Sequence, residues 1–168
     1  MNQLINFFWT ILGFAAVVNY WVSAGLYTWF YLALIISITP VFLPQKVANH
    51  LQLSSNTKFY ERFGIRFIRK FVQHGDFANR LARTSDPRYR VIRQSATPAS
   101  YLKTVMMYER YHLICFIFFL LTSVITLIKG NYFQFLLITI SNIFYNFYPV
   151  LLQQYNRVRI LRINRLIK

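Results

Sequence analysis

Two side chains that could move a proton, Glu109 and His112, stand three positions apart just before an apolar run over residues 113–128. Side chains at that spacing are neighbours on a helix. A carboxylate beside an imidazole orients the ring and stabilises the imidazolium, which is the arrangement of a general base that takes a proton from a hydroxyl. The pattern therefore predicts a catalytic pair. The alternative is an ion pair between Glu109 and Arg110 or another arginine, with His112 a residue of the membrane surface.

A stripe of polar residues and one proline runs down the last apolar segment at spacings of 4, 3, 4 and 3. Its members are Asn142, Asn146, Pro149, Gln153 and Asn156. At ~100° per residue they fall within an arc of about 80° on one helix face, which cannot face lipid. The stripe predicts a cavity that holds a hydroxylated headgroup. The alternative is hydrogen bonding between helices, worth about 0.6 kcal/mol per contact.

Other catalytic and metal-binding motifs are absent. No histidine is followed by an Asp five positions later, so the HxxxxD acyltransferase pattern is missing, and no glycine begins a GxSxG elbow. The three histidines form no HxxH or HxxxH pair, and a single cysteine, Cys115, excludes a Cys-based zinc cluster. We therefore expect a base and a basic surface with no metal and no cofactor.

The composition places these residues in a membrane protein. The chain has 168 residues, of which 56% are hydrophobic and 14% charged, and its net charge is +15. Residues 1–45 carry no charged side chain. So long an uncharged stretch cannot be hidden in the core of so small a protein, because the surface of a soluble domain is largely polar. The balance of +15 excludes an acidic disordered chain, and the low charged fraction argues against a soluble nucleic-acid binder.

Four apolar segments predict membrane spans, at residues 4–22, 26–43, 113–128 and 132–152. Thirteen of the nineteen Lys and Arg lie between the second and third spans, five lie in the C-terminal tail, and only Lys129 lies in the turn of the second hairpin. The positive-inside rule puts both rich regions, and hence both termini, in the cytoplasm. We predict an all-α integral membrane protein with four transmembrane helices in two hairpins.

This pattern divides the chain into four parts: a first hairpin (1–45), a cytoplasmic segment (46–111), a second hairpin (112–152) and a basic tail (153–168). Within the cytoplasmic segment, aromatic and basic residues alternate at helical spacing over residues 58–72. This spacing predicts a basic amphipathic helix that lies against membrane lipid headgroups. Residues 74–100 predict an ordered or lid-like loop, or else a solvated basic loop that only sets the topology.

Residues 142–160 resemble the C-terminal segment of the glycosyl-4,4'-diaponeurosporenoate acyltransferase family, in which a span ending N-x-x-P is followed by Q-R-Y-N-R-P-R-L. In this chain Gln154 stands in place of the first Arg of that motif and Val158 in place of the Pro. Residues 59–72 are similar to the family's E-x-x-G segment. The E-x-x-H pattern that begins at Glu109 falls on a family pattern before the third span.

The resemblance implies a bacterial cell-membrane enzyme that esterifies a fatty acyl chain onto a sugar hydroxyl of a glycosylated carotenoid or related glycolipid. His112 would deprotonate the hydroxyl, Glu109 would hold the imidazole, and an Asn side chain could stabilise the oxyanion. The donor, acyl-CoA or an acidic acyl carrier protein, would be drawn to the arginines. The expected substrate-binding residues are Asn142, Asn146, Gln153, Tyr155, Asn156, Arg157 and Arg159.

Two other functions are open at this point. A non-catalytic membrane subunit or lipid-binding scaffold would use the basic faces only to grip anionic lipid, at about 1 kcal/mol per Lys or Arg. A different membrane-bound transferase could act on a polyprenyl or glycolipid substrate.

Overall fold

The computed structural model describes residues 2–70 and 98–166, and all regular structure in these ranges is helical. The all-α class predicted from the sequence is confirmed. The long elements are α1 (Asn2–Ala24), α2 (Thr28–Ser37), α7 (Pro98–Ile128), α8 (Tyr132–Asn142) and α9 (Tyr148–Leu166). The short ones are the 3₁₀ turn η1 (Thr39–Phe42), α3 (Gln45–His50), α4 (Thr57–Arg62), α5 (Ile65–Ile68) and the π-helical turn η2 (Ile143–Phe147), which joins α8 to α9.

Three helical segments are long and apolar enough to cross a membrane: Asn6–Ala24, Ala99–Ile128 and Tyr132–Arg162. The predicted second span is shorter, because the apolar helical stretch covers only Thr28–Phe42. Proline explains where α2 ends. Pro40 has no N–H to donate to the Ile36 carbonyl, and the Thr39 hydroxyl donates to that carbonyl instead, at 2.8 Å.

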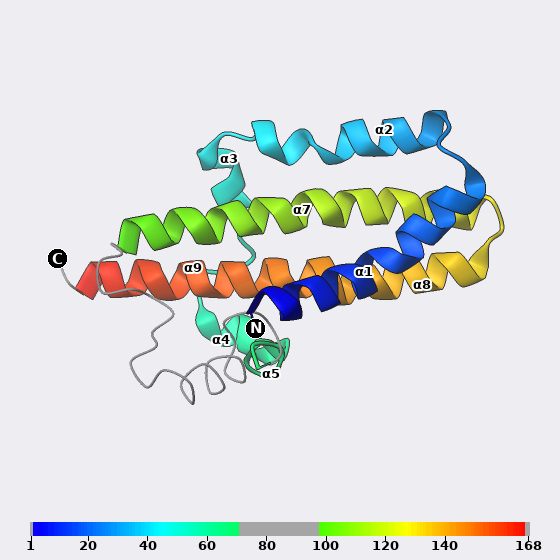
Figure 1. Cartoon of the computed structure of the whole chain (residues 1–168). Coiled ribbons are helices and arrows are strands. Elements are labelled where there is room, and N and C mark those ends of the chain that lie inside the picture. Colours follow the sequence, from blue (N-terminus) through cyan, green and yellow to red (C-terminus); the bar gives the residue numbers. More distant parts are fainter. Residues whose placement is uncertain (1, 71–97, 167–168) are drawn as a thin grey trace.

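The helix α7 runs antiparallel to the α8–η2–α9 rod, whereas α1 and α2 are joined by a turn and pack on different helices (Figure 1). Both turns lie at one end of the bundle, and each contains a glycine with positive φ, Gly25 at 88° and Gly130 at 73°. The short helices α3, α4 and α5 lie toward the opposite end, with the start of α7 and the end of α9. The helix α1 runs obliquely across α8 and η2, whereas α2 packs along α7.

An aromatic cluster joins α1 to α7, α8 and η2. Val17, Tyr20 and Trp21 pack against Phe119 of α7 and against α8 and η2, and the Trp21 indole N–H donates to the Thr122 hydroxyl at 3.2 Å. Outside this cluster large apolar side chains point away from the bundle along α1, α2, α7 and α8. A surface of this kind is stable only where lipid covers it.

The basic segment after α3 is not one helix. It forms α4 and α5, which are separated at Gly64, a residue with φ of 75°. Tyr60 and Ile65 are completely buried against Leu151 and other apolar residues of α9. The segment is thus part of the protein core, with its basic residues on the outer side.

Two of the boundaries predicted from the sequence fall inside continuous helices. The helix α7 begins at Pro98, well before residue 112, and α9 continues past residue 153 to Leu166. Most of the predicted loop over 74–100 lies outside the described residues. The predicted boundaries and the helix ends differ because hydropathy marks where lipid ends, whereas a helix continues for as long as its neighbours pack against it.

The helix α1 approaches the rest of the bundle very closely at Gly13, where an added Cβ would lie 2.5 Å from Cγ of Tyr145. Alanine usually stabilises a helix relative to glycine by up to ~1 kcal/mol. Overpacking costs about 1–3 kcal/mol, so we expect Gly13→Ala to lower the midpoint of thermal unfolding in detergent. Ala15→Val, on the exposed side of α1, is the control and should change the midpoint little. A midpoint unchanged in Gly13→Ala would show that α1 does not press on Tyr145.

Candidate active site

A proline opens the backbone beside the predicted polar stripe. Pro149 is the second residue of α9 and has no N–H to donate to the Tyr145 carbonyl four residues earlier. The preceding turn widens instead, and the Tyr148 N–H donates to the Ile143 carbonyl five residues back. Such π-helical turns occur often at functional sites. Here the turn carries Asn146 of the stripe, and Asn142 directly precedes it at the end of α8.

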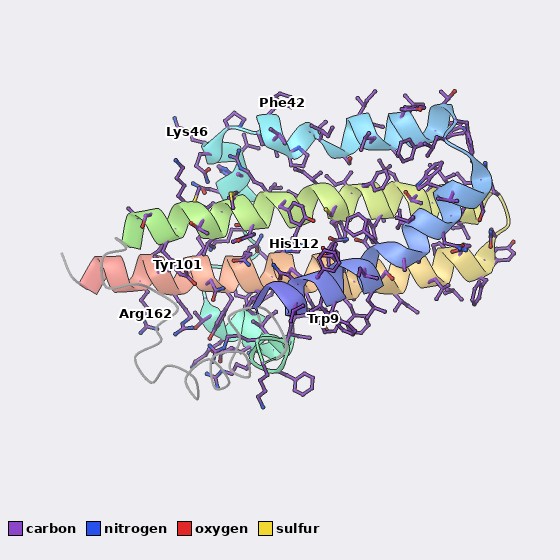
Figure 2. The ribbon with its side chains drawn as sticks, viewed as in Figure 1. Trp9, Phe42, Lys46, Tyr101, His112 and Arg162 are labelled. Atoms are coloured by element: carbon purple, nitrogen blue, oxygen red, sulfur yellow. The ribbon has the colours of Figure 1, made fainter. Side chains whose placement is uncertain are left out.

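His112 meets this turn from α7. Its imidazole packs edge-on against Tyr145, with ring centroids 5.8 Å apart, and against Tyr111 at 5.1 Å. The Asn146 side chain and the Tyr145 backbone lie beside the imidazole. Figure 2 shows His112 in the middle of the bundle, where α1 crosses in front of the α7 pair. Of the predicted stripe, the structure places Asn146 beside His112.

Two polar atoms at this point are buried without a hydrogen-bond partner among the described residues: Nδ1 of His112 and Oδ1 of Asn146. The remaining amide groups of Asn142 and Asn146 form hydrogen bonds: Asn146 donates to Asn142 Oδ1 at 2.9 Å, and Asn142 donates to the Phe116 carbonyl at 3.1 Å. Buried polar groups are nearly always paired. An unpaired base beside an unpaired amide oxygen is therefore a candidate place for hydroxyl groups to bind.

The first helix supplies one wall of this site. The Thr10 hydroxyl lies 2.9 Å from the Tyr145 hydroxyl, and Phe14 packs edge-on against the Tyr145 ring at 5.4 Å. With Gly13 directly against the ring, Tyr145 has one defined position. Sequence reasoning did not connect α1 to the site, because nothing in α1 carries a charge or a motif.

Glu109 points away from His112, toward α9, and no hydrogen bond joins the two within the described part of the chain. One carboxylate oxygen accepts from Gln154 Nε2 at 3.0 Å and the other lies 3.3 Å from Arg157 Nη1. Glu109 and Arg157 are only 7% and 3% exposed. This geometry matches the alternative interpretation of Glu109, an ion pair with an arginine.

Gln154 connects several segments by hydrogen bonds and was not among the predicted site residues. Its Nε2 also donates to the Leu51 carbonyl at 3.0 Å, and its Oε1 accepts from the Leu53 N–H at 3.1 Å and lies 3.2 Å from the Tyr60 hydroxyl. Burial raises the pKa of Tyr60, so this hydroxyl keeps its proton. A buried Glu109 needs a hydrogen-bonding or charged partner, but the sequence alone does not identify Gln154 as that partner.

Arg157 also lies beside a small cavity of about 20 Å³, which apolar residues of η1, α3 and α7 line together with Glu109. This volume holds one water. The Nε and Nη2 atoms of Arg157 are buried and have no hydrogen-bond partner among the described residues. Arg157 is thus a structural cation in the bundle rather than an exposed docking group.

The remaining predicted binding residues lie farther along α9. Gln153 and Asn156 are partly exposed, Tyr155 is buried and Arg159 is exposed. The Arg159 guanidinium lies 5.5 Å from the centre of the Tyr155 ring. They do not join His112, so the stripe is split between a buried pair near the base and a polar region toward the end of α9.

Tyr155 and Arg159 belong to an open basic depression of about 720 Å³. It is lined by Thr57, Glu61, Arg66, Arg69, Tyr155, Arg159 and Arg162. Within it, Glu61 accepts from Arg66 at 3.0 Å and from the Tyr155 hydroxyl at 3.4 Å. Among residues 2–70 and 98–166 no three His, Cys, Asp or Glu side chains are grouped to hold a metal ion.

A family model, glycosyl-4,4'-diaponeurosporenoate acyltransferase, matches residues 44–166. The chain belongs to this family. Membership confirms the resemblance found in the sequence and makes the chain an acyltransferase of the carotenoid pathway. No curated protein and no solved structure matches the chain. The family match covers α7, η2 and α9 and leaves out α1, although α1 holds Tyr145.

The buried and exposed Glu–Arg pairs give a direct test of the site's architecture. Glu109→Gln leaves Arg157 buried without its counter-charge, so we expect the free energy of unfolding to fall by about 3–5 kcal/mol. Glu61→Gln breaks an exposed pair, in which the Arg66 side chain is 71% exposed, and should cost less than about 1 kcal/mol.

Denaturant titration of both variants in detergent measures the two losses. The double variant Glu109→Gln with Arg157→Gln should recover part of the loss, because no charge is then left buried. Equal losses for the two single variants would contradict the buried pair.

Proposed function

We propose that this enzyme transfers a fatty acyl chain from an activated donor to a sugar hydroxyl of glycosylated diaponeurosporenoate or a related glycolipid. The family match supports the reaction class and the acceptor. The acceptor has a long apolar polyene and a polar sugar. It suits a bundle whose outer surface is apolar and whose polar groups lie inside.

We place the enzyme in a bacterial cell membrane with four spans and with both termini in the cytoplasm. The end of the bundle toward α3, α4 and α5 carries the basic residues, whereas the other end carries Lys129 alone among the described residues. The stretch Thr28–Phe42 is about 22 Å long at 1.5 Å per residue. Local thinning of the bilayer accommodates a helix of this length.

The unpaired His112 Nδ1 beside the unpaired Asn146 Oδ1 is the observation that carries the mechanism. A sugar presents neighbouring hydroxyls, so one can donate to the imidazole while the next donates to the amide oxygen. His112 takes the proton of the first hydroxyl as its oxygen attacks the acyl carbonyl. The ester bond forms, the bond to the donor's thiol breaks, and the proton passes to the leaving thiolate. The amide of Asn142 or Asn146 stabilises the oxyanion between these steps.

Glu109 acts in this scheme as a positioning residue. It fixes α7 to α9 through Gln154 and Arg157, one turn before His112 on the same helix. Its effect on the imidazole is therefore through the placement of α7 and not through direct contact.

The alternative function, a lipid-binding scaffold, is favoured by the basic depression alone. A scaffold needs cations at the lipid headgroups and needs no base in the bundle. The two functions differ in what they require of His112.

We expect His112→Gln to lower the rate of acyl transfer at least about 100-fold, because a general base contributes that much or more. The control is His50→Gln, since His50 is exposed on α3 and its Nδ1 lies 2.8 Å from the Lys46 carbonyl; it should retain activity. The assay mixes enzyme in nanodiscs with glycosylated carotenoid and acyl-CoA and measures the acylated product by mass spectrometry. The thermal midpoint of each variant shows whether it is folded. An unchanged rate in a folded His112→Gln would show that His112 is not the base, whereas the scaffold function predicts that the wild-type protein itself forms no acylated product.

A further inference from the structure

The basic depression is not used by the mechanism above. It lies where α4 and α5 pack on the end of α9, and Arg162, one of its lining residues, is on that end of the helix (Figure 2). Its volume of about 720 Å³ falls in the range of small-molecule sites, ~300–1,000 Å³. It is large enough for a ligand the size of a nucleotide.

The charge in the depression is strongly positive. Four arginines line it against one carboxylate, Glu61, which is already paired with Arg66 at 3.0 Å. The other carboxylate in the described part of the chain, Glu109, is buried beside Arg157. Arg159 and Arg162 are exposed. A ligand with several negative charges is the matching partner, because guanidinium groups bind phosphate oxygens through paired N–H donors.

The depression and the neighbour of the proposed base also lie along one helical rod. Asn146 lies beside His112 and Arg159 lies thirteen residues later in the same helical rod, which corresponds to about 20 Å at ~1.5 Å per residue. A donor that binds by its phosphates at Arg159 must carry its thioester across this distance. An extended pantetheine arm has a comparable length.

We propose that the basic depression binds the nucleotide phosphates of an acyl-coenzyme A donor, whose pantetheine arm runs along α9 toward His112. This inference rests on the proposed acyl transfer. An acyl carrier protein is the less fitting donor, because the cations line a hollow of nucleotide size. A carrier protein would instead meet a broad basic face.

The test measures binding of free coenzyme A by calorimetry to the full chain in nanodiscs of zwitterionic lipid. Arg159→Gln with Arg162→Gln removes two lining cations and should weaken binding at least about tenfold, since each removes a charge-assisted hydrogen bond. The matched control is Lys58→Gln with Arg62→Gln. It removes two exposed cations of α4 that do not line the depression, and it should change the dissociation constant less than about twofold.

The ligand series identifies which group is recognised. We expect coenzyme A to bind more tightly than dephospho-coenzyme A, and pantetheine to bind most weakly, because each step removes phosphate charge. Equal binding of pantetheine and coenzyme A would overturn the proposal. So would loss of coenzyme A binding when phosphatidylglycerol is added to the nanodisc, since the depression would then be a lipid headgroup site. Transfer from an acyl carrier protein but not from acyl-CoA would overturn it as well.

The outcomes separate this proposal from the proposed function. Coenzyme A binding needs no acceptor and no base, so it can hold even if no glycosylated carotenoid is acylated. If acylation occurs and depends on His112, but the arginine double variant has an unchanged KM for acyl-CoA, the donor site is wrong and the function stands. We expect the double variant to raise that KM about tenfold and to leave kcat within about twofold.

Discussion

A single carboxylate buried between two long helices organises the basic end of this protein. Glu109 of α7 is paired with Arg157 and hydrogen-bonded to Gln154, both of α9. Removing charges from water is costly, and the pair is tolerated because its partners are close and Gln154 adds a further hydrogen bond. The interaction fixes the register of α7 against α9. Since Gln154 also binds the backbone at Leu51 and Leu53, the segment between α3 and α4 is fixed by the same centre.

Everything else in the proposed site depends on that register. His112 follows Glu109 by one turn, and η2 precedes Gln154 by two turns, so the crossing of the helices brings the imidazole to Tyr145 and Asn146. Pro149 widens the helix at this height and orients the amide toward α7. The base and the amide thus meet because an ion pair and a proline act on the same helix. The depression at the end of α9 is a separate consequence, since α4 and α5 are held there by Tyr60 and Ile65.

Much of this could be predicted from the sequence and some could not. Uncharged stretches and the placement of Lys and Arg predict a helical membrane protein, because the cost of charge in lipid is large and depends on composition alone. The partner of Glu109 was not predicted, since many arginines were available and pairing depends on how helices cross. The stripe includes Gln153 and not Gln154 because it assumes a uniform ~100° per residue, whereas the π-helical turn shifts the angular position of the residues after it. No charge, motif or spacing in α1 or η2 predicts the contact of Thr10 and Gly13 with Tyr145.

The bare contact between Gly13 and Tyr145 has a mechanical consequence. No side chain lies between the backbone of α1 and the Tyr145 ring, so a change in the tilt of α1 acts directly on the ring. Helix tilt follows bilayer thickness. A thicker or thinner bilayer would therefore displace the Tyr145 ring and, with it, the His112 imidazole that the ring contacts.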